Sequence, residues 1–161
     1  AHADVLVMQL EVPVETVLAA ARNAREHSVH VVLNPAPARS LPGDLLRLVD
    51  VLTPNEHEAA LLCGDAHLTP AQAAKRLIAI GVGAVVVTLG ADGALIKTAQ
   101  GEEHAPAYRV NAVDTTAAGD AFTAGFLPAW LAGDSLAESL AAGQRLASVA
   151  VGRVGASPLV V

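Results

Sequence analysis

The chain has 161 residues, which is long enough for one ordinary domain with a sizeable core. Its composition is 53% hydrophobic and 16% charged, which is typical of a globular protein and excludes a disordered one. Aromatic residues make up only 2% and the net charge is −6, so stacking platforms for single-stranded nucleic acid and broad basic surfaces for nucleic acid or anionic membranes are not expected.

Cysteine content and hydropathy narrow the class further. No apolar run approaches the roughly 20 residues needed to cross a bilayer, and the N-terminus lacks a signal pattern, so we expect a cytosolic protein. The single cysteine, Cys63, excludes an internal disulfide and is predicted to be a small buried hydrophobe at a helix end. The chain opens without Met and ends on the apolar run Leu159–Val161, so we expect a piece of something longer.

The first half of the sequence alternates short apolar runs, typical of buried strands, with runs of helical periodicity. In chain order we expect a strand at 4–10, a helix at 14–27, a strand at 29–33, a loop at 34–39, a strand at 49–52, a helix at 55–62 capped by Asn55, and a helix at 69–80 ended by Gly81.

The second half is expected to begin with a hairpin and to end in two helices. A strand at 84–89 leads through the turn Gly90–Gly93 into a strand at 94–98, and helices follow at 118–131 and 135–151. In the last helix, spacing places Leu136, Leu140 and Val149 toward the core. The strand–helix alternation predicts a single α/β domain over residues 1–161, with a mostly parallel sheet sandwiched by helices. In such sheets ligands bind beyond the carboxyl ends of the strands.

The run Thr116-Ala117-Ala118-Gly119-Asp120 stands at an expected strand-to-helix junction. The first N–H groups of a helix lack internal partners, and small residues let a phosphate oxygen approach them. The helix field stabilises the carboxylate of Asp120, which could accept a proton from a hydroxyl. The pattern therefore suggests phosphoryl transfer to an alcohol, although an ordinary Gly- and Asp-rich helix start remains open. A Walker-type Gly-Lys-Ser/Thr loop is absent.

Motifs along the whole chain resemble the ribokinase family of sugar kinases. The Asp-Thr-x-Ala-Ala-Gly-Asp run is highly specific for this family, and the Gln-Leu-Glu and Asn-Pro-Ala-Pro-Ala-Arg runs favour its ribose-phosphorylating members over fructokinase-like or adenosine-kinase-like ones. The matching segments are residues 8–11, 34–39, 53–58, 88–90, 113–120 and 153–156.

The resemblance implies a role for each matching residue. Asp120 would be the catalytic base, and Ala117, Ala118 and Gly119 would form the anion hole. Asn55 and Glu58 would organise Mg²⁺, through water, and the ATP phosphates. The remaining implied sites are a nucleotide-binding turn at Thr88, Gly90, Asp92 and Gly93, an adenine contact at Gln144, a sugar contact at Glu11, and a potassium site at Asp114, Thr116, Ala150, Arg153 and Gly155, with a last ligand near Leu159.

The resemblance also implies a Rossmann-like three-layer fold and an ATP-dependent kinase that converts D-ribose to D-ribose 5-phosphate. It covers only the later part of the family's chain, because the N-terminal portion and the small lid that makes the dimer interface are missing. The chain would then be the nucleotide-binding and phosphoryl-transfer half of a sugar kinase, with little activity alone. Two alternatives remain open: another sugar or nucleoside kinase of the family, and a truncated, non-catalytic nucleotide-binding module.

Overall fold

The computed structural model describes residues 3–155, which fall into two compact units. Of the described residues, unit 1 comprises 3–87 and 96–102, and unit 2 comprises 88–95 and 103–155. Among residues 3–155, no helix combines the length and the apolar character needed to cross a bilayer.

A six-stranded sheet has its strands in chain order, from β1 to β6. The strands are β1 (Val5–Met8), β2 (His30–Leu33), β3 (Val51–Leu52), β4 (Ala84–Thr88), β5 (Ala94–Thr98) and β6 (Glu102–Ala105). The first four pair in parallel, with Val7 opposite Val32 and Val51 opposite Ala84. The expectation of a mostly parallel sheet with helices is confirmed. Strand β6 was not predicted, because its sequence Glu-Glu-His-Ala is polar and largely exposed.

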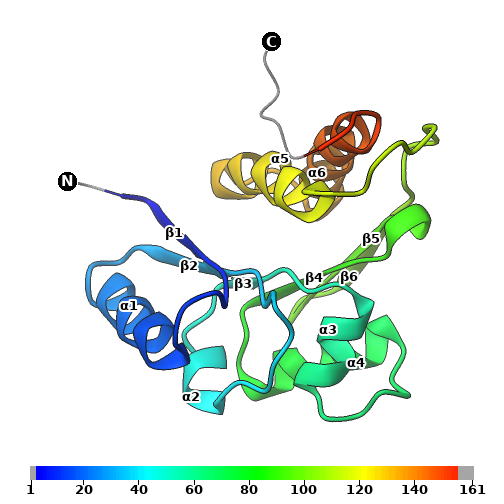
Figure 1. The fold of residues 1–161 in the computed structure, drawn as a ribbon. Coiled ribbons are helices and arrows are strands. Elements are labelled where there is room, and N and C mark those ends of the chain that lie inside the picture. Colours follow the sequence, from blue (N-terminus) through cyan, green and yellow to red (C-terminus); the bar gives the residue numbers. More distant parts are fainter. Residues whose placement is uncertain (1–2, 156–161) are drawn as a thin grey trace. The chain divides into compact units, whose positions relative to one another are not determined.

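In unit 1, the helices lie on one face of the sheet (Figure 1). They are α1 (Val14–Glu26), α2 (Gly43–Leu46), α3 (Glu56–Leu62) and α4 (Pro70–Ile80). Small side chains let helix and sheet pack closely: α1 buries Val17, Ala21 and Ala24, and α4 buries Ala73, Ala74 and Leu77. The short α2, which follows Pro42, was not predicted because four residues carry no periodic signal.

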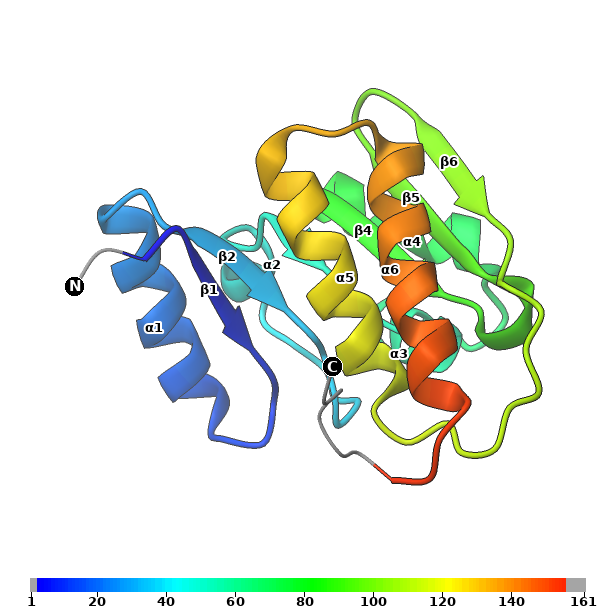
Figure 2. The same cartoon turned by 90° about the horizontal axis from the view of Figure 1, so that it is seen from above.

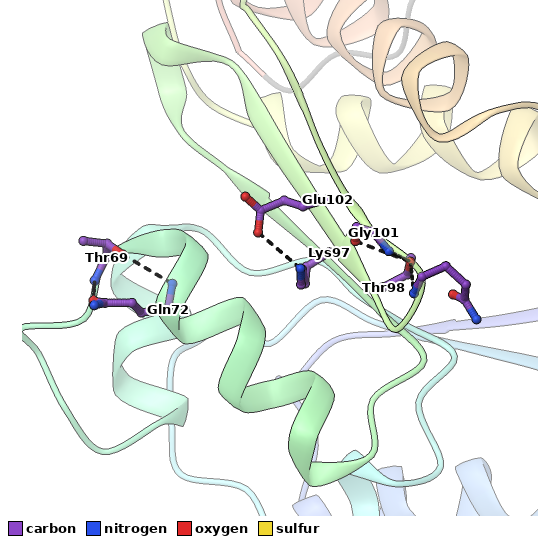
Figure 3. A network of polar contacts seen from close by, with 7 residues as sticks. Thr69, Gln72, Lys97, Thr98, Gly101 and Glu102 are labelled. Carbon is purple, nitrogen blue, oxygen red and sulfur yellow. Dashed lines mark hydrogen bonds and ion pairs between the residues drawn. The ribbon is translucent and has the colours of Figure 1, made fainter.

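Helices α3 and α4 both begin with a capping box, in which side chains satisfy the first orphan amides. At α4 the Thr69 hydroxyl accepts from the Gln72 amide at 3.3 Å, and the Gln72 side chain accepts from the Thr69 amide at 2.9 Å (Figure 3). The same view shows the Lys97–Glu102 ion pair, at 3.7 Å, beside the turn from β5 to β6. Helix α4 ends at Gly81 as predicted, in the positive-φ conformation (φ 122°) that favours glycine.

In unit 2, α5 (Ala118–Ala132) and α6 (Leu136–Val151) lie side by side (Figure 2). A Cβ on Gly125 would lie 2.6 Å from the Ala142 carbonyl oxygen, so these helix backbones meet at a distance that only glycine allows. Phe122 and Phe126 stack with ring centroids 6.0 Å apart. Leu140 is buried as expected, whereas Val149 is 39% exposed and its predicted core position is wrong.

Candidate active site

A cavity of about 490 Å³ lies wholly within unit 2. Its walls come from the turn after β4, the segment 107–112, the start of α5 and one face of α6, so four separate stretches of sequence build it. The lining residues are Thr88, Gly90, Ala91, Gly93, Ala107, Tyr108, Arg109, Val110, Ala112, Thr115, Ala118, Gly119, Phe122, Gln144, Ala147, Ser148 and Val151. The surface is mainly apolar with a few polar groups, as in small-molecule sites.

The structure brings together most residues that the sequence assigned to the nucleotide. Thr88, Gly90 and Gly93 line the cavity from the turn, and Gln144 lines it from α6. Asp92 belongs to the same turn but does not line the cavity; its carbonyl oxygen lies 3.0 Å from Nε2 of His104. The predicted turn between the strands contains a 3₁₀ turn, Gly90–Asp92, and Gly90 and Gly93 both take positive φ. The turn is therefore glycine-dependent.

The start of α5 offers an amide to this cavity. Ala117 is the N-cap, with a left-handed backbone (φ 59°) and no side-chain cap. Within residues 3–155, the amide of Gly119 has no hydrogen-bond acceptor, and a Cβ added to Gly119 would meet nothing within 4 Å. The amide of Ala118, in contrast, already donates to the Thr115 carbonyl at 3.2 Å. The anion hole expected from Ala117, Ala118 and Gly119 is thus open at Gly119 and partly engaged at Ala118.

Asp120 lies in the first turn of α5 and is exposed. Its side chain is therefore accessible to a substrate, as a base must be. The positive end of the helix field favours a carboxylate at this position. Gly119 precedes it directly, so an accessible acid and an open amide occupy consecutive positions.

The carboxylate of Asp114 joins two segments of unit 2. Its Oδ1 accepts from the Thr116 amide at 2.9 Å and from the Thr116 hydroxyl at 2.6 Å, and its Oδ2 accepts from the Gly155 amide at 2.8 Å. These hydrogen bonds, the Thr116 hydroxyl first, lower the pKa of Asp114 to about 2. The loop at 113–116 and the segment after α6 are thereby held side by side.

The predicted potassium residues meet at this Asp114 junction. The Val151 carbonyl accepts from the amides of Val113 and Asp114, and the Ala150 carbonyl accepts from the Arg153 amide at 3.2 Å. The oxygen atoms gathered here belong to a carboxylate, a hydroxyl and backbone carbonyls. Oxygen ligands of these kinds suit a hard monovalent cation. In the described part of the chain no three His, Cys, Asp or Glu side chains gather as a metal cluster. The expected ligand near Leu159 lies outside the described residues.

The other predicted residues belong to unit 1. Asn55 caps α3: its Oδ1 accepts from the Glu58 amide at 2.9 Å, and Oε2 of Glu58 accepts from the Asn55 amide at 2.8 Å. The Asn-x-x-Glu spacing is therefore also a capping box, and Oε2 is the oxygen that the cap uses. Glu11 is exposed and lines a second cavity of about 370 Å³ between β1 and α1.

Several cavity residues were missed by sequence reasoning, among them Tyr108 and Arg109. Tyr108 and Arg109 come from a segment without strand or helix, where no periodic pattern marks a side chain as facing a site. Among the described residues that line the cavity, Arg109 is the one charged side chain. In the sequence, Arg109 stands between the Ala-Pro-Ala run at 105–107 and the Val-Asp-Thr run at 113–115, and this position was the one sequence feature that pointed to the site.

The parallel strands and a cavity that meets a strand end and a helix start define a small-molecule-binding α/β protein. The profile of the pfkB family of carbohydrate kinases matches residues 1–160, and the chain belongs to this family.

Similar proteins include ribokinase from Staphylococcus aureus, 42% identical over 160 residues that cover 96% of this chain and 52% of the relative. Deoxyribokinase from Salmonella typhi is 44% identical over 123 residues, covering 74% of this chain and 40% of the relative. The structure of Arabidopsis thaliana ribokinase complexed with ribose and ATP superposes with a TM-score of 0.88 at 30% identity, over 95% of this chain and 51% of that one. The chain thus spans about half the length of the curated ribokinases it matches.

Proposed function

We propose that this chain is the nucleotide-binding and phosphoryl-transfer half of an ATP-dependent sugar kinase whose acceptor is the primary hydroxyl of D-ribose. The observation that carries the proposal is the cavity of unit 2, which ends at the start of α5 where the Gly119 amide has no acceptor within the described residues. Its volume of about 490 Å³ falls within the range of small-molecule sites.

In the proposed reaction, Asp120 accepts the proton of the sugar hydroxyl as the hydroxyl oxygen attacks the γ-phosphorus of ATP. The bond from that phosphorus to the bridging oxygen breaks, and ADP leaves. Negative charge on the transferring group is stabilised by the Gly119 amide and the helix field, both oriented before the reaction. The amide of Ala118 contributes only if its 3.2 Å hydrogen bond to Thr115 lengthens.

The nucleotide would occupy the cavity with its phosphates toward α5. Thr88, Gly90 and Gly93 would contact it from the turn, and Gln144 would contact the base from α6. Asn55 and Glu58 would organise Mg²⁺ through water while keeping their cap. Oxygens at Asp114, Thr116, Ala150, Arg153 and Gly155 would hold K⁺. Mg²⁺ supplies charge neutralisation to the phosphates when it is bound.

Ribose is proposed as the acceptor because three relatives with 41–42% identity over 96–97% of this chain are ribokinases. A deoxyribose kinase is the second candidate, favoured by the 44% identity to deoxyribokinase over part of the chain. Glu11 is the sugar contact proposed within this chain. The other sugar contacts, a dimer-forming lid and a cytosolic location remain predictions about the parent protein.

The test has two measurements. Calorimetry on the 161-residue chain with Mg²⁺ and ATP should detect binding, and absence of binding would contradict a nucleotide site in unit 2. A longer protein that contains this chain should then be assayed for ADP release with ribose, deoxyribose, fructose and adenosine. Preference for ribose supports the proposal. ATP binding without turnover on any acceptor would instead favour a non-catalytic nucleotide-binding module.

A further inference from the structure

Two of the segments that line the unit 2 cavity meet where β5 begins and β6 ends. One wall is the turn Gly90–Gly93, and the other is the segment 107–112, which follows β6. Contacts inside the turn fix its own shape: the Leu89 amide donates to the Gly93 carbonyl at 2.8 Å, and the Asp92 amide donates to the Leu89 carbonyl at 3.0 Å. Those contacts do not tie the turn to the segment 107–112.

Gly93 provides the first link between the walls. A Cβ on Gly93 would lie 2.0 Å from the Ala105 carbonyl oxygen and 2.8 Å from the Ala107 amide nitrogen. The backbone of the turn is thus pressed against the backbone that leads into the segment 107–112. This contact is steric, and the pairing of β5, which begins at Ala94, with β6, which ends at Ala105, holds the two backbones together on this side of the turn.

His104 provides the second link, which is attractive. Its Nε2 lies 3.0 Å from the Asp92 carbonyl oxygen. A carbonyl oxygen only accepts, so Nε2 must carry the hydrogen and donate it. His104 is exposed and does not line the cavity, so it acts on a ligand only through the turn that it holds.

We propose that His104 is a positioning residue for the nucleotide: its hydrogen bond to Asp92 holds the turn Gly90–Gly93 at the separation from the segment 107–112 that the nucleotide needs. The proposal rests on the proposed nucleotide site. β5 begins directly after the turn and stays paired with β6, so loss of the bond loosens the turn itself, and the internal hydrogen bonds donated by the Asp92 and Gly93 amides open more often. The cavity then widens, and its fit to a bound nucleotide weakens.

The experiment compares two neutral replacements of similar length in the 161-residue chain. His104→Gln retains an N–H donor that can reach the carbonyl, and His104→Met does not. We expect His104→Met to weaken Mg²⁺–ATP binding about three- to ten-fold, and His104→Gln to bind close to wild type. His67→Gln, which changes an exposed histidine in unit 1, is the matched control and should leave binding unaltered.

A second measurement tests the hydrogen bond between His104 and Asp92 in the absence of nucleotide. Hydrogen exchange of the amides of residues 92 and 93 should be faster in His104→Met than in wild type or His104→Gln, with the melting temperature unchanged. If the wild-type chain does not bind ATP, the proposed function is wrong, while the exchange data still decide whether His104 holds the turn. Equal exchange in the Met and Gln variants, or equal loss of ATP affinity in both, would overturn the proposal.

Discussion

Asp120 is exposed in the first turn of α5, directly after Gly119. If it is the base, removing its charge affects the chemical step and leaves nucleotide binding intact. In the longer protein that contains this chain, Asp120→Asn should lower turnover by roughly 10²–10⁴-fold with ATP affinity nearly unchanged, measured by steady-state kinetics and calorimetry. Unaltered turnover would remove Asp120 from this role.

Glu58 caps α3 and is proposed to organise Mg²⁺, and one substitution can separate these two roles. Gln supports a capping box as Glu does, so Glu58→Gln should keep the stability of α3 while losing the charge that would organise Mg²⁺. We expect the melting temperature of this variant to stay near wild type and its Mg²⁺–ATP affinity to fall. Thermal unfolding and calorimetry measure the two effects.

The capping box of α4 provides a matched control for that prediction. Thr69→Ala removes a cap in the same unit and should cost about 1 kcal/mol of stability without changing Mg²⁺–ATP affinity. Asn55→Ala should cost a similar amount and also weaken nucleotide binding. If Glu58→Gln and Thr69→Ala bind Mg²⁺–ATP equally well, the Asn-x-x-Glu motif is only a cap in this chain.

The depressed pKa of Asp114 predicts a pH dependence. Its folded pKa, about 2, lies below the ordinary value of 3.8, so its stabilising contribution is present above about pH 4 and is lost as the pH falls through 2. The stability difference between wild type and Asp114→Asn should therefore shrink between about pH 4 and pH 2. Denaturant unfolding at each pH measures it, and a difference that grows on acidification would contradict the assignment.

Single residues were predictable where local chemistry decides their place. Asn55 as a cap, Gly81 as a helix end and Gly119 as an open amide follow from helix termini alone. The Asp114–Gly155 hydrogen bond joins residues 41 positions apart, and the Thr115–Ala118 bond depends on a left-handed Ala117, so neither could be read from spacing.

Cys63, predicted to be buried at a helix end, is only partly buried. This burial raises the pKa of its thiol, and its Sγ lies 3.5 Å from the Ala73 carbonyl oxygen.

At the scale of elements, the contact between α5 and α6 depends on glycine. Gly125→Ala would place a Cβ 2.6 Å from the Ala142 carbonyl oxygen, and backbone cannot yield cheaply. We expect a loss of roughly 1–3 kcal/mol in the free energy of unfolding, despite the higher helix propensity of Ala, measured by denaturant titration.

A substitution near the end of α6 is the control for Gly125. Gly152→Ala introduces a Cβ that meets its nearest atom at 3.6 Å, and the glycine has an ordinary φ of −77°. Its stability should stay within about 0.5 kcal/mol of wild type. Similar losses in both variants would show that the α5–α6 contact does not determine the effect of Gly125→Ala.

Long periodic elements were predicted well and short or polar ones were not. The helix expected at 135–151 is α6 with Ser135 as its cap, and the helix expected at 69–80 is α4 with Thr69 as its cap. Strand β6 forms from polar residues because β5 offers it a pairing edge after the Thr98–Gly101 turn, a tertiary effect that no residue in it signals. Strand β3 is shorter than the predicted run, since Val49 lies outside regular structure and Asp50 lies in a bend before the strand.

At the scale of the whole molecule, the chain spans about half of the ribokinases it matches, while the cavity is complete within unit 2. The isolated chain should therefore bind Mg²⁺–ATP but release little ADP in the presence of ribose, because the proposed function assigns lid closure and most sugar contacts to the rest of the parent protein. A coupled assay for ADP measures this. Robust ribose-dependent turnover would show that the described half suffices for catalysis.

The α/β class and the family were predictable from sequence because alternation and the Asp-Thr-x-Ala-Ala-Gly-Asp run are local signals. The division into two units was not, since no linker of distinctive composition separates them. The unit boundaries fall within β4, β5 and β6. The cavity combines residues from 88 to 151, and its walls could be assigned only once the fold was known.

Strand β1 stands at the end of the sheet order, with the sequence Val-Leu-Val-Met and with Val7 49% exposed. Its outer backbone edge can add a further β-strand from any chain that presents one, a known origin of aggregation. Concentrated solutions of this polypeptide should consequently tend toward precipitation or fibril growth. A lysine in place of Val7 would make the preparation easier to handle.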